Sequence, residues 1–176
     1  MTQQSTNPWV KAAQNLTPAP APQAPAPVAP REVPVFLAAH GGAGATSWAH
    51  ILGGVDGGLV TGLNQEAPAP GAELVLVARA SLDGIDAAKS AIAIHGYDRF
   101  ACVLLVPSSP TRMPRLIANE VKVLSGAITV IDTPWTPGLL MRRAAQLTPT
   151  DISPKELHKI TASLSQVGVT IEGETP

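Results

Sequence analysis

The chain has a single cysteine among its 176 residues, which excludes a disulfide framework and a zinc site built from cysteines. That residue, Cys102, lies in an apolar run, where a small buried side chain is expected rather than a reactive thiol. Basic residues (12) do not exceed acidic ones (13), so no surface for nucleic acid is indicated. No run approaches the ~20 apolar residues of a membrane span, and no secretory signal pattern is present. A cytoplasmic protein is expected.

Hydrophobic residues make up 45% of the chain, enough for one core of ordinary size. Residues 17–30 alternate proline with alanine, a composition that favours polyproline II and cannot form a packed core. We therefore expect three parts: a disordered N-terminal arm with an Ala/Pro-rich linker over residues 1–31, an α/β domain over residues 32–147, and a C-terminal helix with its tail over residues 148–176. Within the arm, the segment around Trp9 is a candidate docking peptide for a protein partner.

After the linker, apolar runs alternate with helical patterns, which is typical of βαβ units. The runs predict strands over residues 33–39, 73–80, 100–107 and 127–132, and the intervening patterns predict helices over residues 45–52, 82–95 and 113–124. Each apolar run is nearly continuous, as expected when helices cover both faces of a sheet. The predicted fold is a three-layer α/β domain with a mainly parallel sheet of about four to five strands.

The rest of the domain carries weaker signals, apart from its last helix. Residues 53–71 are rich in glycine and proline and predict a long loop, and a helix is expected over residues 137–147. Ser153 and Glu156 form a capping box around a proline at the first helical position. Apolar residues then recur at spacings of three and four, so this helix should pack one face on the core or on a partner. These residues are Leu157, Ile160, Leu164 and Val167.

Residues 40–47 form a glycine-rich turn between a predicted strand and a predicted helix. Such a turn gathers backbone N–H groups at the positive end of the helix dipole, where phosphate binds readily. An alternative is that glycine only allows close packing of strand and helix. The candidate phosphate-binding residues are His40, Gly41, Gly42, Ala43, Gly44, Ala45, Thr46 and Ser47.

The turn and its preceding strand resemble the deviant phosphate loop of the ParA and MinD ATPases, K-G-G-x-G-K-[ST]. His40 takes the place of the signature lysine, and Ala45 that of the ordinary one. The resemblance extends over residues 33–135, although only the predicted loop stands where the family has strands bearing its metal-organising aspartates. It implies a P-loop NTPase-like fold, with ATP and Mg²⁺ as the ligands and Thr46 available for the metal.

The lysine that spans the β- and γ-phosphates stabilises the transition state of phosphoryl transfer, on the order of several kcal/mol, and its loss removes this stabilisation. No catalytic residue is therefore assigned, although the backbone N–H groups of the turn would still bind an anion. Arg79 and Arg112 each follow a predicted strand and are candidates to replace the missing lysines. Asp132 ends an apolar strand, as a magnesium-organising aspartate does. In the family, however, that strand comes before the strand and helix that residues 73–89 resemble, whereas here it comes after them.

A dinucleotide-binding turn is a weaker interpretation, because Asp56 comes too early to hold a ribose. No two of the four histidines have the spacing of a metal site, so no metal ligands are assigned. The leading hypothesis is a non-catalytic adaptor or regulatory module that retains nucleotide or phosphate binding. Its family resemblance points to plasmid or mobile-element maintenance, positioning or secretion. A protein partner is expected at the N-terminal arm or the C-terminal helix. A slow ATPase using Thr46 and Asp132 with Mg²⁺, and a purely structural interaction domain, are the alternatives.

Overall fold

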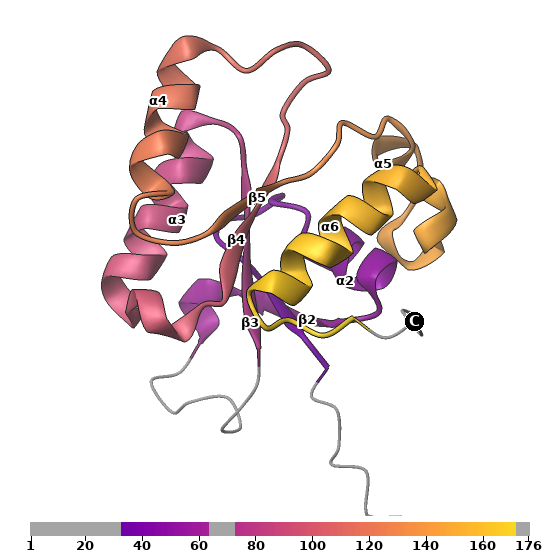
Figure 1. Cartoon of the computed structure of the whole chain (residues 1–176), viewed down its shortest axis with the longest axis horizontal. Coiled ribbons are helices and arrows are strands. Elements are labelled where there is room, and N and C mark those ends of the chain that lie inside the picture. Colours follow the sequence, from indigo (N-terminus) through magenta and orange to yellow (C-terminus); the bar gives the residue numbers. More distant parts are fainter. Residues whose placement is uncertain (1–32, 64–72, 172–176) are drawn as a thin grey trace, which may run out of the picture. The chain divides into compact units, whose positions relative to one another are not determined.

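Among the residues that the structure describes, five short strands form one sheet in which every neighbouring pair is parallel (Figure 1). The computed structural model describes residues 33–63 and 73–171. The strand order is β2-β1-β3-β4-β5, one of the two common orders of doubly wound α/β folds. The strands are β1 (Val35–Ala38), β2 (Val55–Leu59), β3 (Leu74–Arg79), β4 (Cys102–Val106) and β5 (Val130–Asp132).

Helices cover both faces of the sheet, which makes the three layers that the sequence predicts. Helices α3 (Leu82–His95) and α4 (Arg115–Leu124) lie on one face, while α2 (Ala45–Leu52) and α6 (Pro154–Gln166) lie on the other (Figure 1). Alternate residues of the central strands enter two separate apolar cores: Leu104 packs with α2 and α6, and Leu105 packs with α3 and α4. The α/β class and the parallel sheet are confirmed.

The predicted helix boundaries are accurate where a cap or an apolar face marks them. The Ser81 hydroxyl accepts a hydrogen bond from the Gly84 N–H at the start of α3, and Ser153 accepts one from the Glu156 N–H at the start of α6. The apolar stripe of α6 packs on the core, with Ile160 and Leu164 fully buried. Helix α4 begins at Arg115 rather than at residue 113, because Pro114 is its extended N-cap.

The prediction of a loop over residues 53–71 is wrong for its first part, which contains β2 and the 3₁₀ turn η1 (Val60–Gly62). All five residues of β2 are exposed, and two of them are glycines, so the strand has no apolar signal. It forms because its backbone pairs with β1, beginning with the Val55 N–H, which donates to the Pro34 carbonyl at 2.9 Å. Residues 64–71 lie outside the described part of the chain, as does the N-terminal arm of residues 1–31.

The continuous helix expected over residues 137–147 is also absent. The segment contains one turn of helix, α5 (Gly138–Met141), then an extended Arg142 and the 3₁₀ turn η3 (Ala144–Gln146). Leu140 and Met141 are mostly exposed, so no buried face stabilises a longer helix. The guanidinium of Arg142 instead donates to Asp151 at 2.8 Å, in the 3₁₀ turn η4 (Pro149–Asp151). A further 3₁₀ turn, η2 (Tyr97–Arg99), precedes β4.

The strand order brings the ends of β1 and β3 together at a topological switch point. From β1 the chain crosses to β2 through α2, whereas from β3 it crosses to β4 through α3 on the opposite face. Open α/β sheets bind ligands in the crevice that such a divergence leaves at the carboxyl ends of the strands. In the described part of the chain, no helix is long and apolar enough to cross a membrane.

Substitution of Gly54 tests the close approach of β2 to β1. A Cβ at this position would lie 2.7 Å from the Pro34 carbonyl oxygen and would overlap the Phe36 ring. Overpacking of this kind costs about 1–3 kcal/mol, so Gly54→Ala should lower the free energy of unfolding by that amount in urea denaturation. Gly62→Ala is the matched control, since its Cβ would meet no atom within 4 Å. Equal losses in the two variants would contradict the explanation.

The environment of Cys102 predicts its reactivity. Burial raises the pKa of this thiol to about 12, and the thiolate is the reactive form. Alkylation by iodoacetamide at pH 8 should therefore be far slower in native buffer than in concentrated urea, as followed by mass spectrometry. Similar rates in the two solvents would show that the side chain is accessible in the folded protein.

Candidate functional site

The glycine turn that joins β1 to α2 lies at the switch point. Gly42 has a φ of 78° and Gly44 a φ of 100°, values that side chains other than glycine rarely adopt. A Cβ at Gly42 would meet no atom within 4 Å, and one at Gly44 would make only ordinary contacts. The glycines at 42 and 44 are thus explained by backbone conformation and not by close packing of strand and helix.

The amino end of α2 carries N–H groups that are free to bind an anion. Gly44 is the N-cap, no side chain caps the helix, and the first helical hydrogen bond is donated by the Trp48 N–H to the Gly44 carbonyl. The N–H groups of the first turn precede this bond and have no partner within the helix. Together with the helix dipole they favour a negatively charged ligand.

The side chain at position 45, where the loops that the turn resembles carry a lysine, faces the interior. Ala45 is only 3% exposed and belongs to the core between α2 and the sheet. Ala43 is fully buried in the same core. The turn therefore presents backbone atoms to the solvent and methyl groups to the core.

His40 joins the turn to β3 through the backbone. Its Nε2 accepts a hydrogen bond from the Arg79 N–H at 3.3 Å, and its Nδ1 lies 2.9 Å from the Gly41 carbonyl oxygen. An N–H only donates and a carbonyl only accepts, so the two ring nitrogens are engaged with backbone groups of opposite kind. His40 thus holds the turn in place.

Arg79, at the end of β3, supplies the cationic side chain of the turn. Its Nε donates to the Gly42 carbonyl at 3.0 Å. The guanidinium has five N–H donors in total, so most of them remain for a ligand. The sequence predicts that Arg79 lies at the same edge of the sheet as the glycine turn, and its side chain is in direct contact with that turn.

Asp56 is a site residue that sequence reasoning did not assign. Its Oδ2 accepts a hydrogen bond from the Thr46 hydroxyl at 2.6 Å, and its Oδ1 accepts one from the Gly58 N–H at 2.9 Å. The residue lies in β2, the strand that was predicted as loop, and its pairing with β1 brings it beside α2. The only sequence signal was an aspartate among glycines shortly after the turn.

These groups line an open pocket of about 470 Å³ above the turn. Neither Trp48 nor His40 fills it: the Trp48 ring is fully buried in the core, and the His40 ring is held against β3. The lining residues are Ala38, the whole turn from His40 to Ser47, Asp56, Gly58, Leu59, Arg79 and Ala144.

Arg112 and Asp132 do not reach this pocket. Three strand spacings separate β1 from β5, which places Asp132 roughly 14 Å from the end of β1. Asp132 instead lines a separate pocket of about 280 Å³ with hydroxyl groups that include those of Ser108 and Thr133. Arg112 is exposed in the connection between β4 and α4. The sequence-based pairing of Thr46 with Asp132 around one magnesium ion is not formed.

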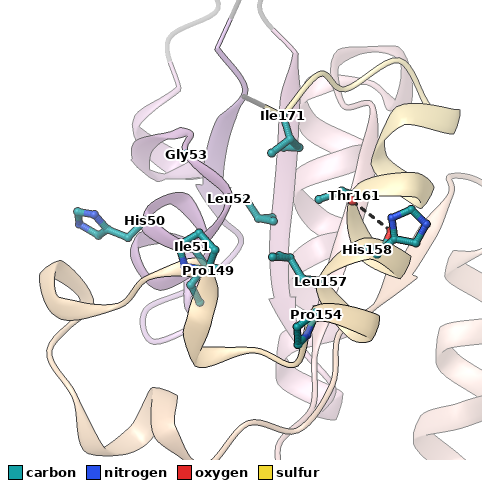
Figure 2. A pocket seen from close by; sticks show the side chains of 10 residues that line it. All are labelled: His50, Ile51, Leu52, Gly53, Pro149, Pro154, Leu157, His158, Thr161 and Ile171. Atoms are coloured by element: carbon teal, nitrogen blue, oxygen red, sulfur yellow. Dashed lines mark hydrogen bonds between the residues drawn. The ribbon is translucent and has the colours of Figure 1, made fainter. Parts of the chain in front are cut away.

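Another pocket, of about 410 Å³, lies at the opposite end of α2, between that helix and α6 (Figure 2). Leu52 and Leu157 face one another across it, while the His50 ring points outward (Figure 2). Its lining contains no acidic residue, lysine or arginine. The pocket is a hydrophobic groove, whereas a carboxylate and a guanidinium lie together at the glycine turn.

No family model, curated protein or solved structure matches this chain. Over residues 33–63 and 73–171, no three acidic, histidine or cysteine side chains gather closely enough to hold a metal ion.

The bridge made by His40 predicts a loss of stability on its removal. In His40→Ala the Arg79 N–H loses its acceptor in a partly buried position, which costs about 1–3 kcal/mol. His50→Ala is the control, because that side chain is exposed on α2 and should change stability by less than about 0.5 kcal/mol. Thermal and urea unfolding of the two variants measure the difference, and an unchanged His40→Ala would refute the structural role.

Proposed function

We propose that this protein is a non-catalytic regulatory or adaptor module that binds a phosphate-bearing ligand at the glycine turn. One observation carries the proposal: the turn is open above its backbone N–H groups, and Arg79 from a neighbouring strand adds a cation at its rim. Helix dipole, N–H groups and guanidinium all favour the same kind of ligand, an oxyanion with several acceptor oxygens.

The absence of catalysis follows from what surrounds this anion site. Phosphoryl transfer requires positively charged groups that stabilise the negative charge developing on the phosphates in the transition state. Ala45 is buried, and both ring nitrogens of His40 are engaged with the backbone. Arg79 is the one remaining cation among the residues that line the pocket, and part of its guanidinium is used to hold Gly42.

Thr46 and Asp56 are suited to a magnesium ion that arrives with the phosphate. Their oxygens lie 2.6 Å apart at the edge of the pocket, and Mg²⁺ is commonly held by one or two protein oxygens together with phosphate oxygens and water. When bound, Mg²⁺ would neutralise the repulsion between the Asp56 carboxylate and a phosphate. Asp56 thus takes the role that the sequence suggested for Asp132.

A slow ATPase is the second candidate, and the contact between Thr46 and Asp56 is the observation that favours it. A relation to the ParA and MinD ATPases remains a proposal that rests on the residues of the turn. It would place the module in plasmid or mobile-element maintenance, positioning or secretion. The apolar face of α6 is used by the core, so a protein partner at the C-terminal helix would meet its polar face.

Calorimetric titration of the full chain with tripolyphosphate and Mg²⁺ tests the proposal. Saturable binding is expected, and Arg79→Gln should weaken it about tenfold or more, since a charged hydrogen bond contributes about 1.5–3 kcal/mol. Arg112→Gln is the matched control and should bind as the parent does, because Arg112 lies outside the pocket. Asp56→Asn should reduce the dependence on Mg²⁺.

Two results would contradict this function. The absence of binding at millimolar tripolyphosphate would contradict the anion site and favour a purely structural interaction domain. Release of phosphate from ATP at a rate typical of enzymes, about 1 s⁻¹ or faster, would show that the protein is a catalyst.

A further inference from the structure

A narrow crevice adjoins the phosphate pocket on the side of β4 and β5. It shares Gly44, Ser47 and Arg79 with that pocket, and its remaining wall includes Trp48 from α2 and Trp135 from the segment after β5. Its volume is about 60 Å³, which corresponds to about two water molecules at ~30 Å³ each. A ligand held at the glycine turn therefore has a second cavity within its immediate reach.

Trp48 contributes a buried donor without an acceptor to this region. The ring is fully buried, and among the described residues its Nε1 has no hydrogen-bond partner. The Cδ1 atom, which is bonded to Nε1, lies 3.8 Å from the position of a Cβ built on Gly44, so this edge of the indole lies against the turn. Buried donors are almost always paired in folded proteins, and the crevice that Trp48 lines is where an acceptor from outside the chain can enter.

The outer wall of the crevice carries large apolar side chains. Trp135 is partly buried there, and Leu140, which also lines the crevice, is 62% exposed. Met141 follows it and is 85% exposed. Large apolar side chains left open beside a polar pocket are typical of a surface that a ligand covers.

We propose that the ligand of the glycine turn is a phosphate ester of a planar heterocyclic ring, and that Trp48 and Trp135 form its ring subsite. The edge of the ring enters the crevice, where an oxygen or nitrogen acceptor takes the Trp48 Nε1–H. The ring face lies along Trp135 and Leu140, and Arg79 lies between the ring and the phosphates. This inference rests on the proposed function, because the phosphate must first be held at the turn.

Comparison of ATP and CTP with tripolyphosphate separates the ring subsite from the phosphate site. All three probes carry the same chain of phosphates, and calorimetry with Mg²⁺ gives their dissociation constants on the full chain. At least one nucleotide should bind about tenfold more tightly than tripolyphosphate, the scale of stacking on an aromatic side chain. Equal affinities for all three would overturn the ring subsite while leaving the proposed function intact. Failure of all three to bind would overturn the proposed function itself.

Two variants locate the effect. Trp135→Leu keeps an apolar wall but removes the flat face, and Trp48→Phe keeps a ring in the core but removes the donor. Each should abolish most of the nucleotide preference while leaving tripolyphosphate affinity within about twofold, whereas a merely structural defect would weaken all probes together. Trp9→Phe is the control for removing a tryptophan elsewhere and should change neither affinity. Retention of the full preference in both Trp135→Leu and Trp48→Phe would overturn the proposal.

Discussion

The site depends on one backbone constraint, the reversal of the chain between the end of β1 and the start of α2. The reversal passes through positive φ at Gly42 and Gly44, and contacts from β3 hold it from the side. His40 accepts from the backbone of Arg79, and the Arg79 side chain donates to Gly42. Strand β3 thus fixes the turn with the same residue that adds charge to it. Because β1 and β3 are neighbours whose connections diverge, this arrangement leaves an opening above the helix amino end.

At this turn, the groups that can bind an anion differ from the groups that catalysis would need. Binding of an anion uses N–H groups that every helix amino end possesses and one guanidinium from a neighbouring strand. Catalysis needs cations placed by the turn itself, and here those positions hold a buried methyl group and a histidine occupied by the backbone. The proposed function follows from this division, and the proposed ring subsite in the crevice beside Gly44 would distinguish one phosphate ester from another.

Sequence patterns predicted most of the fold because burial and capping are local signals. Four strands and the helices α2, α3 and α6 were found from apolar runs, apolar stripes and capping residues such as Ser81 and Ser153. Strand β2 was missed, since its side chains are all exposed and its backbone pairing with β1 leaves no trace in the sequence. Asp56 lies on this strand and was therefore not assigned to the site. Asp132 was assigned instead, because it ends a strand with an evident apolar pattern.

The sequence by itself determined that the chain forms a layered α/β domain, that a glycine turn follows the first strand, and that the turn contains no lysine. These features depend on residue type and spacing along the chain. Only the tertiary structure decided which distant residues meet at the turn: it brought Arg79 and Asp56 there, kept Arg112 and Asp132 away, and placed Trp48 beneath it. The reason is that strand order fixes which carboxyl ends are neighbours, and strand order depends on contacts between residues far apart in the sequence, which local patterns along the chain do not display.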